Sequence, residues 1–202
     1  MIKAILFDIF GVLYPDTFWA IVHKHVPDAD FRRAQFSELL RRVDLGHVER
    51  DQFWNETAAL IGISRGDLDA ELENLKNCDR DLMAYIGELK GRKYKTGVIS
   101  NVGHGFVEQV FVDYKTDDYF DAMILSSDVG VVKPDPMIYG LAAEKLGVLP
   151  QECVFIDDLE KNVKGAEDAA MKGILYKSVG KLREELEPLL TDADYQTSLG
   201  AH

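Results

Sequence analysis

Three short, mostly apolar segments of this chain each end in polar side chains, and this pattern constrains the fold more than any other feature. The segments and the polar residues after them are residues 2–7 before Asp8, residues 95–99 before Ser100 and Asn101, and residues 153–156 before Asp157 and Asp158. Runs of this length are typical of strands buried on both faces of a sheet. In a parallel sheet such strands end at one edge, where α/β proteins bind ligands, so these polar side chains should converge there.

Helix-like segments alternate with these strands along most of the chain. Helices are predicted over residues 82–89, 103–113, 136–146, 160–171 and 181–190, and further strands over residues 122–125 and 174–176. Strands that alternate with helices predict an α/β fold whose parallel sheet is covered on both faces. We therefore expect a Rossmann-like, three-layer α/β/α core.

Residues 15–86 differ in character from the rest of the chain. They carry aromatic, leucine and charged residues at helical spacing, with glycines between the periodic stretches. This pattern predicts a compact bundle of about four short helices, whose aromatic residues form its own core. The expected organisation is a core of residues 1–14 and 87–190, an inserted all-helical cap of residues 15–86, and a polar, loosely held tail of residues 191–202.

The overall charge excludes several classes of partner. The net charge is −12 at pH 7 and the isoelectric point is about 4.8, which argues against binding to nucleic acid or to anionic membranes. The sequence has no apolar run long enough to span a bilayer and no signal segment.

The two cysteines, Cys78 and Cys153, suit a reducing compartment. We expect a cytoplasmic protein, either a monomer or a homodimer.

The polar residues predicted to converge suit phosphoryl transfer onto an aspartate. Lys133 adds an ammonium group from the loop after residues 122–125, and Pro134 disfavours a helical backbone at Lys133. Carboxylates crowded together favour Mg²⁺, a cation that prefers oxygen ligands. With the ion and Lys133 neutralising a phosphate, Asp8 can attack phosphorus to give an acyl-phosphate that water cleaves. Ser100 can donate a hydrogen bond to a phosphate oxygen.

Four stretches of the chain, in order, carry a family resemblance. They are residues 7–13 around Asp8, residues 98–101 ending in Ser100 and Asn101, residues 132–136 around Lys133, and residues 155–162 with Asp157, Asp158 and Asn162. They resemble the four motifs of the haloacid dehalogenase-like hydrolase superfamily. The inserted bundle resembles the helical cap of its phosphatase-rich subfamily.

The resemblance implies a role for each matching residue. Asp8 would be the nucleophile and a Mg²⁺ ligand, the backbone carbonyl of Phe10 a second ligand, Asp158 a direct ligand and Asp157 an outer ligand. The phosphate of a small phosphorylated metabolite would be held by Ser100, Asn101 and Lys133, with Gly11 beside it. Relatives also place a substrate-reading loop near the position of Gly46 and His47.

One position departs from the family pattern. Phosphatases of this family usually carry a second aspartate two residues after the nucleophile, where it moves protons, and this chain has Phe10 there. Phenylalanine cannot transfer a proton, and such assistance is typically worth about 10²–10⁴ in rate. Three interpretations stay open: a slow phosphatase, a haloacid dehalogenase, since those relatives carry an aromatic residue there, or a binding protein that has lost catalysis. His104 is a further hypothesis for proton transfer, because it follows Asn101 closely.

Overall fold

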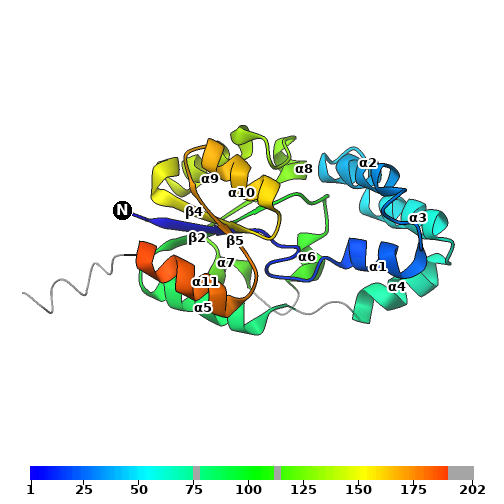
Figure 1. Cartoon of the computed structure of the whole chain (residues 1–202), viewed down its shortest axis with the longest axis horizontal. Coiled ribbons are helices and arrows are strands. Elements are labelled where there is room, and N and C mark those ends of the chain that lie inside the picture. The colour runs from blue at the N-terminus through cyan, green and yellow to red at the C-terminus, as the bar shows by residue number, and fades with distance from the viewer. Residues whose placement is uncertain (75–77, 112–114, 191–202) are drawn as a thin grey trace, which may run out of the picture.

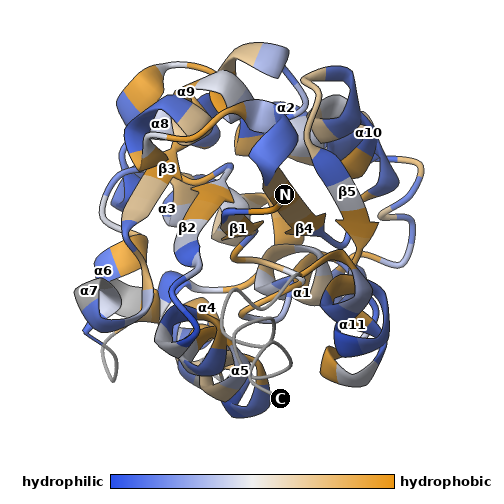
Figure 2. Cartoon of the chain, turned by 90° about the vertical axis from the view of Figure 1, so that its left-hand side faces the viewer, coloured by the Kyte–Doolittle hydropathy of each residue, from blue (hydrophilic) through white to orange (hydrophobic). Residues whose placement is uncertain are grey.

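A parallel sheet forms the centre of the protein. The computed structural model describes residues 1–74, 78–111 and 115–190. The strands are β1 (Ala4–Phe7), β2 (Lys95–Ser100), β3 (Ala122–Leu125), β4 (Cys153–Asp157) and β5 (Lys172–Leu175). They lie in the order β3-β2-β1-β4-β5, and every neighbouring pair is parallel (Figure 2). The predicted α/β fold with a parallel sheet is confirmed.

Helices cover both faces of this sheet (Figure 1). One face carries α8 (Ser126–Val129), α9 (Pro136–Leu146) and α10 (Glu160–Asp168), and the other carries α5 (Arg80–Gly91), α7 (Thr116–Tyr119) and α11 (Val179–Leu186). Side chains alternate across each strand. Ile5 and Phe7 therefore belong to the cluster with α5 and α11, whereas Leu6 belongs to the cluster with α9.

A second lobe of four helices lies beyond the carboxyl ends of the strands (Figure 1). These helices are α1 (Thr17–His25), α2 (Arg33–Asp44), α3 (Arg50–Ile61) and α4 (Arg65–Asn74), and we call them the cap lobe. The lobe has its own buried cluster, in which the rings of Phe18, Phe53 and Trp54 contact one another. The aromatic residues of the insertion thus pack as the core of a helical bundle, as the sequence predicts.

The packing of α5 moves the boundary between the two lobes. The predicted boundary between residues 86 and 87 falls inside this helix, yet its buried side chains, including Leu82, Ile86 and Leu89, belong to the cluster under the sheet. By packing, α5 is a core helix, because helical spacing alone does not reveal which core an amphipathic helix covers.

Smaller elements complete the fold. Of the helix predicted over 103–113, residues 112 and 113 lie outside the described residues, and the described part contains the short α6 (Val107–Val110). Two 3₁₀ helices are present: η1 (Pro150–Glu152) precedes β4, and η2 (Glu187–Leu189) follows α11. Neither Cys78 nor Cys153 forms a disulfide within the described part of the chain. Among the described helices, none combines the length and the apolar character needed to cross a bilayer. The predicted tail, residues 191–202, lies outside the described residues.

Candidate active site

The register of the sheet brings Asp8 and Asp157 together. β1 lies between β2 and β4, and Phe7 is level with Val98 on one side and with Ile156 on the other. The residue directly after β1 is Asp8, whose backbone N–H donates to the carbonyl of Ile156 at 2.9 Å. The strand ends therefore meet at one edge, as the alternation of strands and helices predicts.

Three carboxylates form the centre of this edge. Asp8, Asp157 and Asp158 each offer an oxygen, and these oxygens lie within 4.8 Å of one another. Asp157 is fully buried and accepts hydrogen bonds from the backbone N–H of Leu159 at 2.9 Å and from the amide of Asn162 at 3.0 Å. By contrast, Asp158 Oδ1 is buried and has no hydrogen-bond partner among the described residues. An oxygen left in this state beside two other carboxylates fits a hard cation such as Mg²⁺.

Gly11 makes room for the third carboxylate. Its φ is +87°, and a Cβ built on it would lie 2.3 Å from Cγ of Asp158 and 2.4–2.6 Å from the two carboxylate oxygens. Only glycine fits this position without moving Asp158. The structure thus gives Gly11 a steric role toward the acidic cluster, whereas the sequence analysis placed it beside the phosphate.

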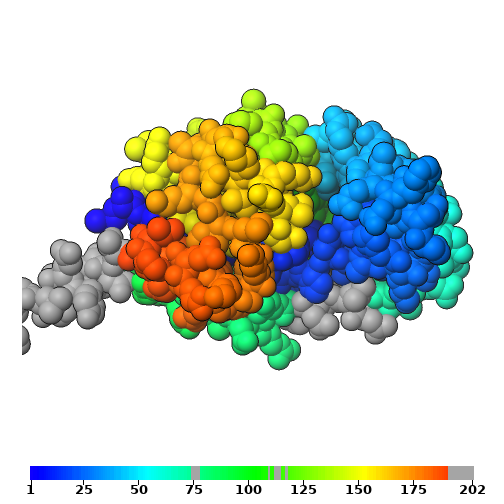
Figure 3. Space-filling model, viewed as in Figure 1, coloured from blue at the N-terminus to red at the C-terminus, as the bar shows by residue number. Residues whose placement is uncertain are grey.

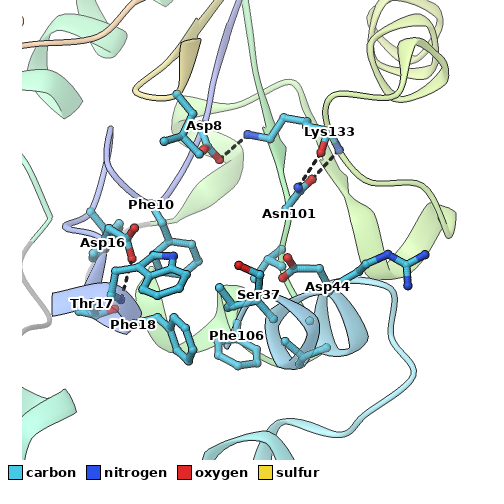
Figure 4. Close-up of a pocket in the computed structure, with 18 of the residues that line it drawn as sticks. Asp8, Phe10, Asp16, Thr17, Phe18, Ser37, Asp44, Asn101, Phe106 and Lys133 are labelled. Atoms are coloured by element: carbon cyan, nitrogen blue, oxygen red, sulfur yellow. Dashed lines mark hydrogen bonds and ion pairs between the residues drawn. The ribbon is translucent and has the colours of Figure 1, made fainter. Parts of the chain in front are cut away.

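Lys133 bridges two of the carboxylates. Its Nζ lies 2.8 Å from Asp8 Oδ1 and 2.7 Å from Asp157 Oδ2, and its side chain is 1% exposed. Asn101 holds the backbone of Lys133 from both sides: Nδ2 donates to the lysine carbonyl at 3.1 Å, and Oδ1 accepts from its N–H at 2.7 Å (Figure 4). Asn101 therefore positions the ammonium group, a role that the sequence analysis did not assign to it. The Lys133–Pro134 peptide bond is cis.

The site carries more negative than positive charge. Burial raises the pKa of Asp8 to about 7; the charge of Asp157 adds to this rise, and Lys133 opposes it. Burial and Asp157 likewise raise the pKa of Asp158 to about 6. Burial acts to lower the pKa of Lys133, but the two carboxylates outweigh it and raise this pKa above its usual value. Three carboxylates beside one ammonium group leave a net negative site that a divalent cation would stabilise.

A cavity of about 900 Å³ opens above these groups, between the core and the cap lobe. On the face of the molecule that Figure 3 shows, the core and the cap lobe lie directly against each other. The core contributes Asp8, Asn101, Lys133 and Asp158 to the cavity wall, and the cap lobe contributes aromatic rings, including Trp19 and Trp54, and polar side chains, including Ser37, Arg41 and Asp44 (Figure 4). Its size suits a small organic molecule.

Comparison with known proteins identifies the family. A family model described as haloacid dehalogenase-like hydrolase matches residues 2–170. The chain belongs to this family. The family named from the four motifs is thus confirmed, and with it the prediction of a hydrolase.

Individual relatives are similar to parts of this hydrolase. Over 118 residues, 55% of the chain, it is 41% identical to bifunctional epoxide hydrolase 2 of Rattus norvegicus, of which the match covers 21%. Over 109 residues, 54% of the chain, it is 38% identical to glyceraldehyde 3-phosphate phosphatase of Methanopyrus kandleri, of which it covers 46%. The chain thus spans less than half the length of either relative.

A solved structure shares the fold. The hydrolase aligns, with a TM-score of 0.69 and 23% identity over 89% of this chain and 96% of the other, with a HAD family enzyme from Bacteroides thetaiotaomicron. That enzyme was crystallised as a complex with magnesium and inorganic phosphate. At this level of identity the likeness shows the fold alone.

Three residues of the predicted site, Gly11, Ser100 and Asp157, do not line the cavity. Ser100 of the hydrolase is fully buried, its hydroxyl has no hydrogen-bond partner within the described part of the chain, and it does not line the cavity. Its contact with a phosphate stays a prediction, as does the metal contact of the Phe10 carbonyl. The side chain of Phe10 does line the cavity, and it has no group that can exchange a proton.

The structure adds one residue that the sequence analysis missed. Asp44, the last residue of α2, lines the cavity, and its burial raises its pKa to about 7. The only sequence signal for it was its place two residues before Gly46, where the resemblance puts a substrate-reading loop. His104, the earlier hypothesis, does not line the cavity and pairs with Asp128 at 3.3 Å.

Proposed function

We propose that this hydrolase is a Mg²⁺-dependent phosphatase that cleaves small phosphorylated metabolites through an aspartyl-phosphate on Asp8. The single observation that carries the proposal is the buried ion pair of Asp8 and Lys133, which faces a cavity of metabolite size next to Asp158. The names of two matched proteins support it, one a phosphatase and the other a structure with magnesium and phosphate.

Each residue of the site has a task in this mechanism. Asp8, Asp158 and the carbonyl of Phe10 would hold Mg²⁺, with Asp157 as an outer ligand; when bound, the ion neutralises the phosphate and the carboxylates. Lys133 binds a phosphate oxygen and keeps Asp8 oriented, while Asn101 fixes Lys133. Asp8 then attacks phosphorus in line with the leaving oxygen, and water later cleaves the acyl-phosphate.

Phe10 limits this chemistry. The usual proton donor of the family is absent from its usual position, so we expect alkyl phosphates to react slowly unless another group supplies the proton. Phosphates whose leaving group needs little protonation, such as p-nitrophenyl phosphate, should react readily.

Phe10 also favours a second candidate, a haloacid dehalogenase, because halide leaves without a proton. Asp157 and Asp158 argue against it, since carboxylates without a cation would repel an anionic 2-haloacid. The two functions differ in their need for metal.

The test compares p-nitrophenyl phosphate and 2-chloropropionate, each with Mg²⁺ and with EDTA, for the wild type and Asp8→Asn. The proposal predicts nitrophenol release that requires both Mg²⁺ and Asp8. Chloride release that persists in EDTA would establish the dehalogenase instead. No turnover of either substrate would favour a protein that only binds its ligand.

A further inference from the structure

We propose that Asp44 of the cap lobe is the proton donor to the leaving oxygen, and then the base that activates water, in place of the acid missing at Phe10. This proposal rests on the phosphatase function proposed above. It assigns a catalytic role to a residue that the four motifs do not include.

Asp44 lies on the side of the cavity that the leaving group must face. In phosphoryl transfer the attacking and leaving oxygens are roughly in line through phosphorus. Because Asp8 attacks from the core, the leaving oxygen points toward the cap lobe. Figure 4 shows Asp44 across the cavity from Asp8, at the end of α2.

The backbone of Asp44 is fixed to the core. Its carbonyl accepts a hydrogen bond from Ser126 Oγ at 2.5 Å, and the same hydroxyl accepts from the N–H of Val102 at 2.9 Å. Next to this contact, a Cβ built on Gly103 would lie 2.5 Å from Val43 Cγ2, so the loop after β2 touches the end of α2 directly. The position of Asp44 relative to Asp8 is therefore set by core contacts and not by the cap lobe alone.

The surroundings of Asp44 keep its carboxyl partly protonated at neutral pH. Burial raises its pKa to about 7; the charge of Asp8 adds to this rise, while Lys133 and Lys161 oppose it. A carboxyl at its ordinary value of 3.8 would be almost fully ionised at pH 7. A group that first donates and then accepts a proton works best when its pKa is near the working pH.

The proposed steps balance in protons and bonds. As the bond between Asp8 and phosphorus forms, the bond from phosphorus to the leaving oxygen breaks, and that oxygen takes its electron pair and the proton of Asp44. The alcohol leaves, and water enters the position that it vacated. Asp44, now a carboxylate, removes a proton from this water as the water attacks phosphorus, which releases inorganic phosphate and restores both aspartates.

The test is Asp44→Asn, assayed with Mg²⁺ on p-nitrophenyl phosphate, phenyl phosphate and glycerol phosphate. We expect kcat/KM to fall by a factor of about 10²–10⁴ on glycerol phosphate and by a smaller factor on phenyl phosphate. On p-nitrophenyl phosphate it should fall less than about tenfold. On glycerol phosphate, kcat/KM of the wild type should fall as the pH rises above about 7, and this fall should be absent from the variant. Asp44→Glu, which keeps a carboxyl, should recover part of the activity.

Glu38→Gln is the matched control, because it removes one negative charge from an exposed position of the same helix outside the cavity. Thermal unfolding of each variant checks that the fold is kept. Asp44→Asn with wild-type turnover of glycerol phosphate would overturn the proposal, and so would an equal loss on all three substrates, which would indicate positioning only. A wild type without Mg²⁺-dependent turnover of any of them would instead refute the phosphatase function itself.

Discussion

Replacement of Lys133 by methionine tests the electrostatic account of the site. The change removes the only ammonium group paired with Asp8 and Asp157 in the described structure and keeps an unbranched side chain of similar length. Both carboxylates are at most 9% exposed at their side chains, so water cannot replace the lost partner. Removing one partner of a buried ion pair costs about 3–5 kcal/mol. We therefore expect Lys133→Met to lower the free energy of unfolding by this amount at pH 7 without metal.

The same variant has a defined pH dependence. Lys133 opposes the rise that brings the pKa of Asp8 to about 7, so this pKa should lie higher in the variant. As the pH falls from about 9 to about 7, Asp8 of the variant takes up a proton and loses its unpaired charge, so the difference in stability from the wild type should shrink over this range. Lys164→Met is the control, because Lys164 pairs with Asp168 at the surface of α10 and its side chain is 63% exposed; its loss should cost less than about 1 kcal/mol. Urea unfolding in EDTA measures both variants. If the free energy of unfolding of Lys133→Met at pH 7 lies within about 1 kcal/mol of the wild-type value, the reasoning is refuted.

Three further predictions follow from the same geometry. Phe10→Asp should raise the turnover of glycerol phosphate, most strongly when combined with Asp44→Asn, and no gain in steady-state assays would count against our account of the missing acid. Gly11→Ala should weaken Mg²⁺ binding in calorimetry at least tenfold, because its Cβ would displace Asp158; unchanged affinity would contradict the predicted ligand. The pKa of Asp158 is raised from 3.8 to about 6, so its ionisation destabilises the folded protein at pH values above 3.8. The stability gained by Asp158→Asn in EDTA should therefore grow from pH 4 to pH 7, and a constant gain in thermal unfolding would contradict this.

The sequence was sufficient to predict the strand ends and the acids on them. Residues 153–156 and the first strand read as buried runs, and a parallel register then brings Asp8 and Asp157 level without further information. The helical insertion was also predictable, since its periodicity differs from that of the core. These features are local in the sequence or follow from the sheet alone.

Contacts between distant segments were not predictable. The amide of Asn101 hydrogen-bonds to the backbone of Lys133, and the absence of a side chain at Gly11 leaves room for the Asp158 carboxylate. Neither the spacing nor the residue types in the sequence indicate these pairs. Helical spacing likewise does not show whether the apolar face of α5 packs on the sheet, as it does in the structure, or on the cap lobe. In the sequence Asp44 is an ordinary acid at the end of a predicted helix. Only the docking of this helix end against α8 and the loop after β2 places Asp44 in the cavity.

The most direct test of the central claim is the chemical state of Asp8 during turnover. Acid-quenched samples of the enzyme with Mg²⁺ and p-nitrophenyl phosphate, digested and analysed by mass spectrometry, should contain a phosphate on the Asp8 peptide that is absent from Asp8→Asn. An alkyl ester on Asp8 after incubation with 2-chloropropionate, or a turning-over enzyme with no phosphate at Asp8, would contradict the account.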